Sequence, residues 1–456
     1  MDFSVLDYGA KADGKTLDTA AIQAAIDLAA AAGGGRVVFP SGSKFLSGSL
    51  EIKANVNLHF EKGSLLEASD SYPDYTPNHN IKSLTDGEVD EYVLPQRAFI
   101  VGYKANGCSI TGEGTISGNA DGFILERGQY IHVMRAPETG GSQYLERPFT
   151  IFLIDSKNVS LKDFTLKDPA FWAVRLTGCN DLEIDSIKIL TDLMVPNADG
   201  IDIDRCQRVR IANCELVTAD DCISLKSCSG TSQYGDVADI EIENCYMVST
   251  SGAITLGTET VGDIRNVRVS GCTVERSHRG FAVRAREGGL ISDVVFENSK
   301  VSTRAFSPLW WGHGEALHVT AFAWNEPGLV GDGNPERSLP GKVRNVVFRD
   351  LEVESEAGIL NWAADPSLIQ NILYQNVILS IGTQSKWNHR IDLKPNDLLP
   401  VVERPHNAFE AVNVSDIEVD NLKIVWDKES RGRYGNSLFV DSALGFKAKT
   451  INETIE

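Results

Sequence analysis

The sequence predicts an all-β fold, a parallel β-solenoid in which short strands stack coil upon coil. The first observation is a recurring unit of Asn or Asp, alternating apolar residues, a polar turn and a second strand. The second is that the alternation has period two and uses β-branched residues, which indicates strands rather than helices. The third is that successive copies begin 23, 27, 31, 27, 27, 52, 26 and 45 residues apart, as expected of a repeat fold.

The copies are Asn158–Leu161, Asp181–Ile184, Arg208–Ile211, Asp239–Ile242, Asn266–Val269, Asp293–Phe296, Asn345–Phe348, Asn371–Tyr374 and Asp416–Val419. A leucine-rich solenoid would need a Leu-rich consensus and a helical half, and neither is present in the sequence. The two longest intervals indicate coils that carry long loops. Because a strand of four residues cannot bury its apolar face alone, we expect one cooperative domain over residues 1–456.

The first 45 residues differ from the repeats. Ala-rich spacing over Thr16–Ala32 predicts an amphipathic helix that ends at Gly33–Gly35. A helix there is expected to cover the open end of the stack, because an uncovered sheet edge invites aggregation. We expect coils with long groove loops over residues 46–430 and a C-terminal tail over residues 431–456.

Long polar segments at about residues 69–96, 118–146, 305–342 and 383–410 are expected to be loops that flank a groove. Tryptophans in and near these segments are Trp310, Trp311, Trp324, Trp362 and Trp387. In a groove such rings would stack on sugar faces, and packing within the core or the loops is the alternative.

Composition limits the partners of the chain. The net charge of −20 disfavours nucleic acid and anionic membranes. It would also repel an acidic polysaccharide at long range, so such a substrate needs cationic residues in the site. No apolar stretch approaches the length of about 18 residues that a membrane helix needs. The N-terminus has no basic start and no apolar signal-peptide core. We expect a cytoplasmic protein, with export as the alternative if a signal was removed.

The chain has eight cysteines but no CxxC pair, so a zinc site has little support. Cys214, Cys245 and Cys272 occupy equivalent positions of successive repeats. We expect stacked buried thiols, and disulfides remain possible if the protein is exported.

Two short acidic clusters precede neighbouring predicted strands. Asp199 lies in the first, Asn197–Gly200, and Asp220 and Asp221 lie in the second, Ala219–Cys222. The spacing of 21 residues from Asp199 to Asp220 is about one coil. Three acids on neighbouring coils suit acid-assisted cleavage of a sugar–sugar bond, because the leaving oxygen needs a proton and water needs a carboxylate base. Simple turn residues are the alternative.

The direction of these carboxylates follows from strand geometry. If Ile201 and Ile223 point inward, a straight strand would send Asp199 and Asp221 inward as well. For all three acids to share a cleft, the chain must turn just before each strand, and Gly200 would permit this in the first cluster. We therefore expect both clusters at strand entries, with no carboxylate in the solenoid interior.

Roughly residues 1–320 resemble glycoside hydrolase family 28, the polygalacturonase family of right-handed parallel β-helices. The matching segments are Tyr8–Gly14, Ile110–Gly118, Arg147–Phe149, Pro169–Trp172, Pro196–Asp202, Asp220–Ile223 and Trp310–Glu315. The resemblance implies hydrolysis with inversion at the anomeric carbon. It assigns Asp220 as the general acid, and Asp199 and Asp221 as the pair that holds and activates water. It implies no cofactor and no metal.

The chain departs from the family pattern at two places. Gly252 occupies the place of the family histidine that lies near the acids. In the segment that matches the family's Arg-Ile-Lys, Ala282 takes the place of the arginine and Arg284 that of the lysine, and Arg286 alternates with Arg284. His313 and His278 are candidates to replace the missing imidazole, with a structural role for each as the alternative.

These departures disfavour plain polygalacturonan as the best substrate. A rhamnogalacturonan fragment or a side-chain linkage next to a uronate is one candidate, and a neutral or less acidic glycoside is the other. The expected partner is therefore a carbohydrate, a pectic oligosaccharide or related glycoside, and the long loops favour exo action. The candidate substrate-binding residues are Asn197, Lys226, Arg284, Arg286, His313 and Trp311. A β-helix lyase and a non-catalytic sugar-binding protein are the alternatives from other functional classes.

Overall fold

A computed structural model describes residues 1–77, 97–123, 147–307, 311–325 and 335–456 of the chain. It divides the chain into two compact units, Met1–Asp220 and Asp221–Glu456. Both units consist of right-handed parallel β-helix coils, so the predicted all-β fold is confirmed. No helix in the described part of the chain is long and apolar enough to cross a membrane.

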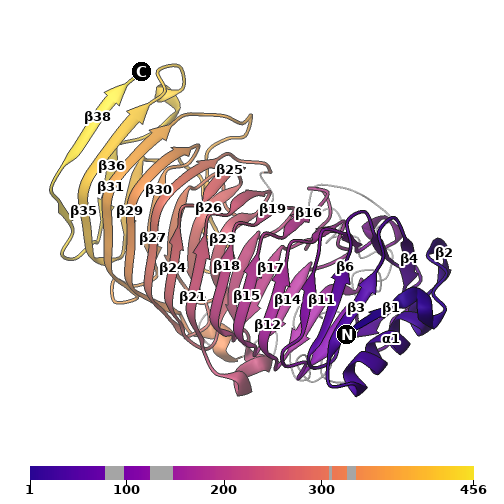
Figure 1. Cartoon of the computed structure of the whole chain (residues 1–456). Helices are drawn as coiled ribbons and strands as arrows, with labels where there is room; N and C mark the ends of the chain where they lie inside the picture. The colour runs from indigo at the N-terminus through magenta and orange to yellow at the C-terminus, as the bar shows by residue number, and fades with distance from the viewer. Residues whose placement is uncertain (78–96, 124–146, 308–310, 326–334) are drawn as a thin grey trace. The chain divides into compact units, whose positions relative to one another are not determined.

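Three ladders of parallel strands form the first unit (Figure 1). One ladder contains β1 Asp2–Ser4, β3 Gly35–Phe39, β6 Val56–Phe60, β9 Ser109–Thr111, β12 Lys157–Lys162, β15 Asn180–Asp185 and β18 Gln207–Ala212. The second contains β2 Asp13–Leu17, β4 Lys44–Ser47, β7 Leu65–Ala68, β10 Thr115–Ser117, β13 Thr165–Lys167, β16 Lys188–Leu190 and β19 Glu215–Thr218. The third contains β5 Leu50–Glu51, β8 Ala98–Tyr103, β11 Phe149–Ile154, β14 Val174–Thr177 and β17 Ile201–Asp204.

Helix α1, Thr19–Ala31, confirms the predicted N-terminal helix and lies beside β1 and β3 at the start of the first unit (Figure 1). Its apolar face is formed by Ile22, Ala25, Ile26 and Ala29, which are all buried. Gly33 and Gly34 take positive φ angles of 89° and 127°, a conformation that ends a helix at little cost in glycine. The helix therefore covers the end of the coil stack as expected.

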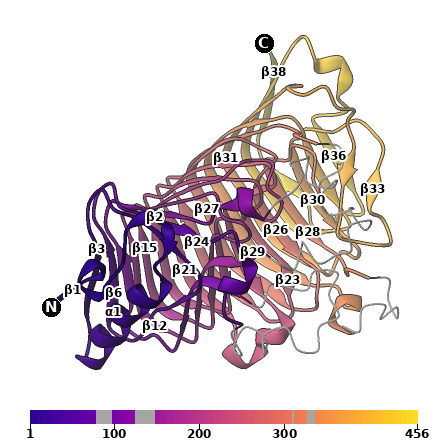
Figure 2. The same ribbon diagram turned by 90° about the vertical axis from the view of Figure 1, so that its right-hand side faces the viewer.

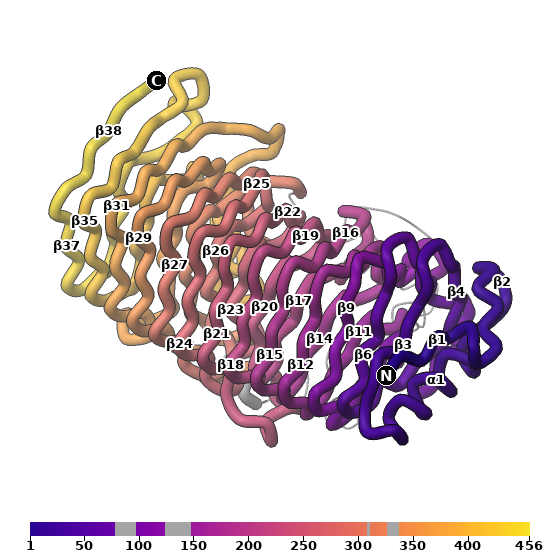
Figure 3. Tube along the Cα trace, in the orientation of Figure 1, coloured from indigo at the N-terminus to yellow at the C-terminus, as the bar shows by residue number. Residues whose placement is uncertain are grey.

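In the second unit, one ladder contains β20 Ile223–Ser227, β23 Gly252–Thr260, β26 Arg279–Ala285, β28 Leu317–Ala321, β30 Ile359–Ala363, β34 Phe409–Val412 and β36 Leu438–Asp441. The remaining strands of this unit pair in parallel in two further ladders that merge at β27. They are β21 Val237–Glu243, β22 Tyr246–Ser249, β24 Ile264–Ser270, β25 Thr273–Ser277, β27 Leu290–Thr303, β29 Lys342–Ser355, β31 Ile369–Ile381, β35 Ser415–Trp426, β37 Lys447–Ala448 and β38 Ile451–Ile455. Figure 2 shows β26, β28 and β30 as neighbours, and Figure 3 follows the successive coils through β27, β29, β31 and β35.

Short elements complete the structure. Short 3-10 helices in the described part of the chain are Val5–Tyr8, Tyr72–Asp74, Ala120–Gly122, Ser229–Tyr234, Pro335–Ser338 and Arg431–Arg433. β32 Ile391–Asp392 and β33 Val401–Val402 form an antiparallel pair. The segment expected as a tail, 431–456, contributes β36, which pairs with β34, and β38, which pairs with β35.

The Asn or Asp at the start of each repeat has a conformational reason. All nine repeat-start residues take left-handed φ angles, from 53° at Asp416 to 61° at Asp239, and eight of them are Asn or Asp, with Arg208 as the exception. Asn and Asp tolerate this region better than other side chains. Their side chains also bond from coil to coil: Asn371 Nδ2 donates to Asn345 Oδ1 (2.7 Å), and Asn345 Nδ2 donates to Asp293 Oδ1 (2.9 Å). Each coil therefore begins at a fixed bend.

In the core, buried residues at equivalent positions of successive coils stack on one another in register. In the first unit Ile151, Val174 and Ile201 are aligned partners on β11, β14 and β17, and all three are fully buried. In the second unit the rings of Phe296, Phe348 and Tyr374 stack with centroids 5.0 Å apart at each step. This register places successive outward positions of β20, β23, β26 and β28 side by side.

Candidate active site

Asp199 lies in the first unit, in the bend that leads into β17. Its backbone carbonyl accepts a hydrogen bond from Ala173 N–H (3.0 Å), and the carbonyl of Gly200 accepts one from Val174 N–H (3.0 Å). The bend is therefore tied to β14 before regular pairing begins with Val174 opposite Ile201. This anchoring fixes Asp199 at the entry of a strand, as predicted.

Asp220 closes the first unit. Its N–H lies 3.5 Å from the carbonyl of Ala198, and its own carbonyl accepts a hydrogen bond from Thr218 Oγ1 (2.5 Å). Ala198 and Ala219, the residues before Asp199 and Asp220, are packed in a buried apolar cluster with Ala120 and Val195. The residue before each of these two acids is therefore anchored in the apolar interior of the first unit.

The bend of the first acidic cluster is made by Asn197. Within this cluster of described residues the left-handed conformation falls on Asn197 (φ 54°) and not on Gly200, so the expectation for Gly200 is wrong. Asn197 Oδ1 accepts a hydrogen bond from Arg147 Nη2 (3.2 Å). Arg147 is buried and also donates to the carbonyls of Ala170 (3.0 Å) and Pro196 (2.6 Å). Asn197 therefore has a clear structural contact, and its proposed contact with substrate stays a prediction.

Asp221 opens the second unit and is held by two side chains. Ser251 Oγ donates a hydrogen bond to Asp221 Oδ1 (3.1 Å), and Arg279 Nη2 lies 3.8 Å from the same oxygen. The side chain of Asp221 is 10% exposed and that of Arg279 is 1% exposed. The next residue, Cys222, is tied through its N–H to the carbonyl of Gly252 (2.9 Å). Asp221 thus also sits at a strand entry, with a buried guanidinium beside its carboxylate.

Lys226, a predicted substrate contact, forms an ion pair within the second unit. Its Nζ lies 3.1 Å from Glu259 Oε2, and both groups are largely shielded from solvent, with side chains 8% and 25% exposed. Burial acts to raise the pKa of Glu259, but the Lys226 ammonium holds this pKa below its usual value. Lys226 therefore already has an anionic partner.

Arg284 and Arg286 lie on β26 and differ in the donors they have left. Arg286 uses all five N–H groups: it donates to the carbonyls of Ala285, Thr320, Leu393 and Pro395 and to Thr320 Oγ1. Arg284 donates to the carbonyl of Lys394, while its Nε has no partner among the described residues. The geometry therefore favours Arg284 over Arg286 as a contact for a substrate carboxylate.

Trp311 is the predicted aromatic contact. Its ring lies 5.5 Å from the Arg284 guanidinium carbon and meets the ring of Trp324 edge-on at 5.9 Å. Trp362 instead belongs to a buried cluster with Phe322, Leu360, Ile391, Leu393 and Val412. Trp310 lies outside the described residues. Of these tryptophans, Trp311 is the one placed beside a candidate binding cation.

The two histidines proposed as replacements for the missing imidazole are both fully buried. His278 Nε2 bonds to the carbonyl of Gly312 (2.9 Å), and its Nδ1 accepts from Phe306 N–H (3.0 Å), so both ring nitrogens are used by the backbone. The ring of His313 stacks on that of His406 with centroids 5.7 Å apart. Burial, followed by the charge of Arg390, lowers the pKa of His313 to about 4. The structural role, named above as the alternative, fits the contacts of His278.

Several buried polar atoms on this face of the second unit lack a protein partner. Thr255, Ala282 and His318 are aligned partners on β23, β26 and β28. Thr255 Oγ1, His318 Nδ1 and Glu315 Oε1 are buried and make no hydrogen bond within the described part of the chain. Buried polar atoms are nearly always paired in folded proteins, with protein groups or with water. These unused atoms are therefore candidate contacts for water or for a polar ligand.

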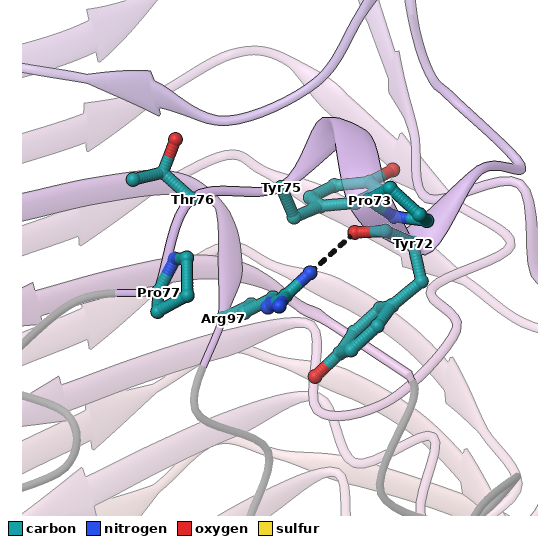
Figure 4. A pocket seen from close by; sticks show the side chains of 6 residues that line it. All are labelled: Tyr72, Pro73, Tyr75, Thr76, Pro77 and Arg97. Carbon is teal, nitrogen blue, oxygen red and sulfur yellow. Dashed lines mark hydrogen bonds between the residues drawn. The ribbon is translucent and has the colours of Figure 1, made fainter.

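A hollow lies in the first unit, at some distance in sequence from the acids. Its volume is about 660 Å³. Figure 4 shows the residues that line it, which are Tyr72, Pro73, Tyr75, Thr76, Pro77 and Arg97. Arg97 Nη1 donates to the carbonyl of Tyr72 (2.8 Å), and its guanidinium lies over the Tyr72 ring at 4.3 Å. The only charged side chain of the lining is thus already engaged.

Sequence reasoning missed Arg279, Ser251 and Arg175. Arg175 is buried, lies opposite Asp202 in the β14–β17 register and bonds Asp204 Oδ2 (3.2 Å). Arg279 lies opposite Gly252 on neighbouring strands. The interval of 27 residues between the repeats that start at Asp239 and Asn266 equals the separation of Gly252 from Arg279, and this spacing would have revealed the pair.

The described residues contain no group of three or more His, Cys, Asp or Glu side chains placed to hold a metal ion. The eight cysteines are all free thiols, and seven of them are buried. Burial raises the pKa of the Cys108 thiol to about 12. The expectation of buried thiols is thereby confirmed for all but Cys228.

Two family models match the chain. The family described as "Glycosyl hydrolases family 28" matches residues 63–309, more than half of the chain, and a second family, "Rhamnogalacturonase A/epimerase, pectate lyase-like", matches residues 3–71. A probable polygalacturonase of Vitis vinifera is 29% identical over 84% of this chain and 75% of that protein. An exo-poly-alpha-D-galacturonosidase of Dickeya chrysanthemi is 24% identical over 78% of this chain and 62% of that protein.

Among solved structures, a family 28 exopolygalacturonase of Yersinia enterocolitica superposes with a TM-score of 0.65. The alignment covers 100% of this chain and 78% of that one; the TM-score shows a shared fold, and the sequence identity is 17%. The family match is with hydrolases, which decides against the lyase and the non-catalytic alternatives. The chain belongs to glycosyl hydrolases family 28 and is a glycoside hydrolase.

Proposed function

We propose that this enzyme hydrolyses a glycosidic bond of a pectin-derived poly- or oligosaccharide with inversion at the anomeric carbon. Asp220 is the general acid, and Asp199 and Asp221 hold and activate the attacking water. The observation that carries the proposal is that each of these acids sits at the entry of a parallel strand. Asp199 and Asp220 are held there by backbone hydrogen bonds, and Asp221 is held by the side chains of Ser251 and Arg279. The names of the relatives from Vitis vinifera and Dickeya chrysanthemi support a pectic substrate.

The chemistry explains why carboxylates are required. A sugar oxygen leaves poorly unless it is protonated, so one carboxyl group must deliver a proton. Inversion requires water to attack the opposite face, and that water needs a carboxylate base. In inverting enzymes the acid and the base lie about 6.5–9.5 Å apart so that water fits between them.

The substrate is proposed to carry a uronate beside the cleaved bond, in a linkage other than that of plain polygalacturonan. The Ala282 side chain cannot bind a carboxylate, so the substrate contact expected of the arginine in the family's Arg-Ile-Lys is missing. Arg284 retains an unused Nε next to the Trp311 ring, and a guanidinium beside an aromatic ring suits a sugar that bears a carboxylate. The neutral substrate remains the competing proposal. Release from a chain end is supported by the Dickeya chrysanthemi relative, whose name states exo action.

The test is a panel of oligosaccharides followed by proton NMR from the first minutes of reaction. Unsubstituted oligogalacturonides, rhamnogalacturonan oligosaccharides and neutral pectic side-chain oligosaccharides are supplied in parallel. We expect the fastest turnover on a uronate-containing substrate other than the unsubstituted one, with a single sugar released as the inverted anomer. A retained anomer, or a product that absorbs in the ultraviolet because it carries a double bond, would contradict the proposed mechanism.

We also propose that the protein works in the cytoplasm. The eight cysteines remain free thiols, which is the usual state in reducing compartments. Cell fractionation that finds the protein outside the cytoplasm would contradict this.

A further inference from the structure

Gly252, at the place of the family histidine, lies against Asp221. A Cβ atom built on Gly252 would lie 2.7 Å from Asp221 Oδ1 and 2.5 Å from Thr255 Oγ1. Both distances are too short for van der Waals contact, so no side chain fits at position 252 while these groups keep their places. The missing histidine is therefore part of a local rearrangement around Asp221, in which another group occupies the space.

That group is the guanidinium of Arg279. Arg279 is the register partner of Gly252 on the neighbouring strand, and its Nη2 lies 3.6 Å from the position that a Cβ of residue 252 would take. The same Nη2 donates to Ser251 Oγ (3.1 Å), while Ser251 Oγ donates to Asp221 Oδ1 (3.1 Å). Arg279 therefore reaches the Asp221 carboxylate in two ways, through the serine hydroxyl and directly as an ion pair at 3.8 Å.

The far side of Arg279 is enclosed by the segment Trp311–Gly312. Arg279 Nη1 donates to the carbonyl of Trp311. Gly312 has φ +92°, and a Cβ there would lie 2.7 Å from Arg279 Cδ, so only glycine lets the segment approach this closely. His278 fixes the same segment through the Gly312 carbonyl (2.9 Å). The guanidinium is thus held from both sides and cannot swing away from Asp221.

We propose that Arg279 is a positioning residue that replaces the missing family histidine and, together with Ser251, fixes the orientation of the Asp221 carboxylate toward water. The inference rests on the proposed function, in which Asp221 acts on the attacking water. A carboxylate with one oxygen held by a serine hydroxyl and a buried guanidinium presents its other oxygen in a fixed direction. The role of Arg279 is distinct from substrate binding, so it should affect the rate of the chemical step more than the affinity.

The experiment compares Arg279→Met, Arg279→Lys and Ser251→Ala on the best substrate of the panel. We expect Arg279→Met to lower kcat about 100-fold, the cost of a misplaced catalytic group, with KM changed less than about threefold. Arg279→Lys should recover about tenfold of that loss, because it restores a cation beside Ser251 and Asp221. Ser251→Ala should lower kcat about tenfold with KM unchanged, since it removes one hydrogen bond to the carboxylate.

Arg268→Met is the matched control, because Arg268 pairs with Glu297 on another face of the second unit and its side chain is 51% exposed. It should leave kcat and KM unchanged. Thermal unfolding of each variant separates misfolding from lost positioning, and Ser251→Ala keeps the test valid if Arg279→Met does not fold. If both Ser251→Ala and Arg279→Lys retain the wild-type kcat, or if Arg279→Met raises KM as much as it lowers kcat, the inference is overturned.

Asp221→Asn distinguishes a failure of the positioning role of Arg279 from a failure of the proposed function of Asp221. If Asp221→Asn abolishes turnover while the Arg279 and Ser251 variants do not slow it, only the positioning role fails. If Asp221→Asn turns over like the wild type, the proposed function of Asp221 fails and the role of Arg279 falls with it.

Discussion

Asp220 is the residue on which the proposed chemistry depends most directly. Replacing it with Asn keeps the shape and the backbone contacts to Ala198 and Thr218 but removes the transferable proton. We expect Asp220→Asn to lower kcat about 1,000-fold, within the range that general acids supply, while the Kd for substrate stays within about threefold. Asp181→Asn is the control, because Asp181 pairs with Arg208 at the surface. A rate for Asp220→Asn within about twofold of the wild type would refute the acid assignment.

Some residues of the candidate site could be predicted from the sequence and others could not. The acidic clusters could be predicted, because their residue types and spacing are local and specific. Arg279 could not be recognised from its own neighbourhood, since its importance comes from a register that joins it to Gly252. The bend at Asn197 was missed for a similar reason: glycine is the usual choice for positive φ, but the Arg147 guanidinium holds the Asn197 side chain and so stabilises the left-handed bend there.

At the scale of elements, each strand is stable because equivalent residues of successive coils stack on one another. Phe348 on β29 is fully buried and lies between Phe296 and Tyr374, with ring centroids 5.0 Å from each. We expect Phe348→Ala to lower the free energy of unfolding by about 3–5 kcal/mol, the usual cost of deleting a buried aromatic ring. Urea unfolding followed by circular dichroism measures this change.

Two further variants serve as comparisons for Phe348→Ala. Phe348→Leu keeps most of the apolar volume and should cost less than half as much. Ile378→Ala, at a side chain that is 43% exposed, should change the unfolding free energy by less than about 1 kcal/mol. Equal losses for Phe348→Ala and Ile378→Ala would argue against a continuous stacked core.

The elements were predictable to different degrees. The strand repeats were predicted because alternation and the left-handed Asn or Asp are both written locally in each copy. The merging of two faces into single long strands, as in β27, β29, β31 and β35, was not. Merging depends on whether strand pairing continues through the bend that otherwise separates the two strands of a coil. Asn298 and Asn376 keep positive φ at such bends, inside β27 and β31. Local sequence alone does not distinguish a bend within a strand from a break between two.

At the scale of the whole molecule, buried ionisable groups act on stability in opposite directions with pH. Burial lowers the pKa of His278, His318 and His406. These side chains favour the folded state above the histidine pKa of the unfolded chain, about 6.5, and this contribution is lost as the pH falls. Burial raises the pKa of Glu315 to about 7 and that of Glu287 to about 8. These glutamates oppose folding increasingly as the pH rises above the unfolded value of about 4.3.

Glu315 allows one of these contributions to be isolated. Between about pH 4.5 and pH 7 the folded chain keeps a proton on Glu315 that the unfolded chain has released, so this group makes the free energy of unfolding fall as the pH rises. The expected slope is at most about 1.4 kcal/mol per pH unit. Glu315→Gln should remove it, so that the difference in unfolding free energy between variant and wild type grows in favour of the variant from pH 5 to pH 7. Urea unfolding at pH 5, 6 and 7 measures this difference, in which the histidine and Glu287 contributions cancel. Glu113→Gln, at an exposed side chain, should show no such trend, and a constant difference for Glu315→Gln would show that the Glu315 carboxyl ionises alike in the folded and unfolded chain.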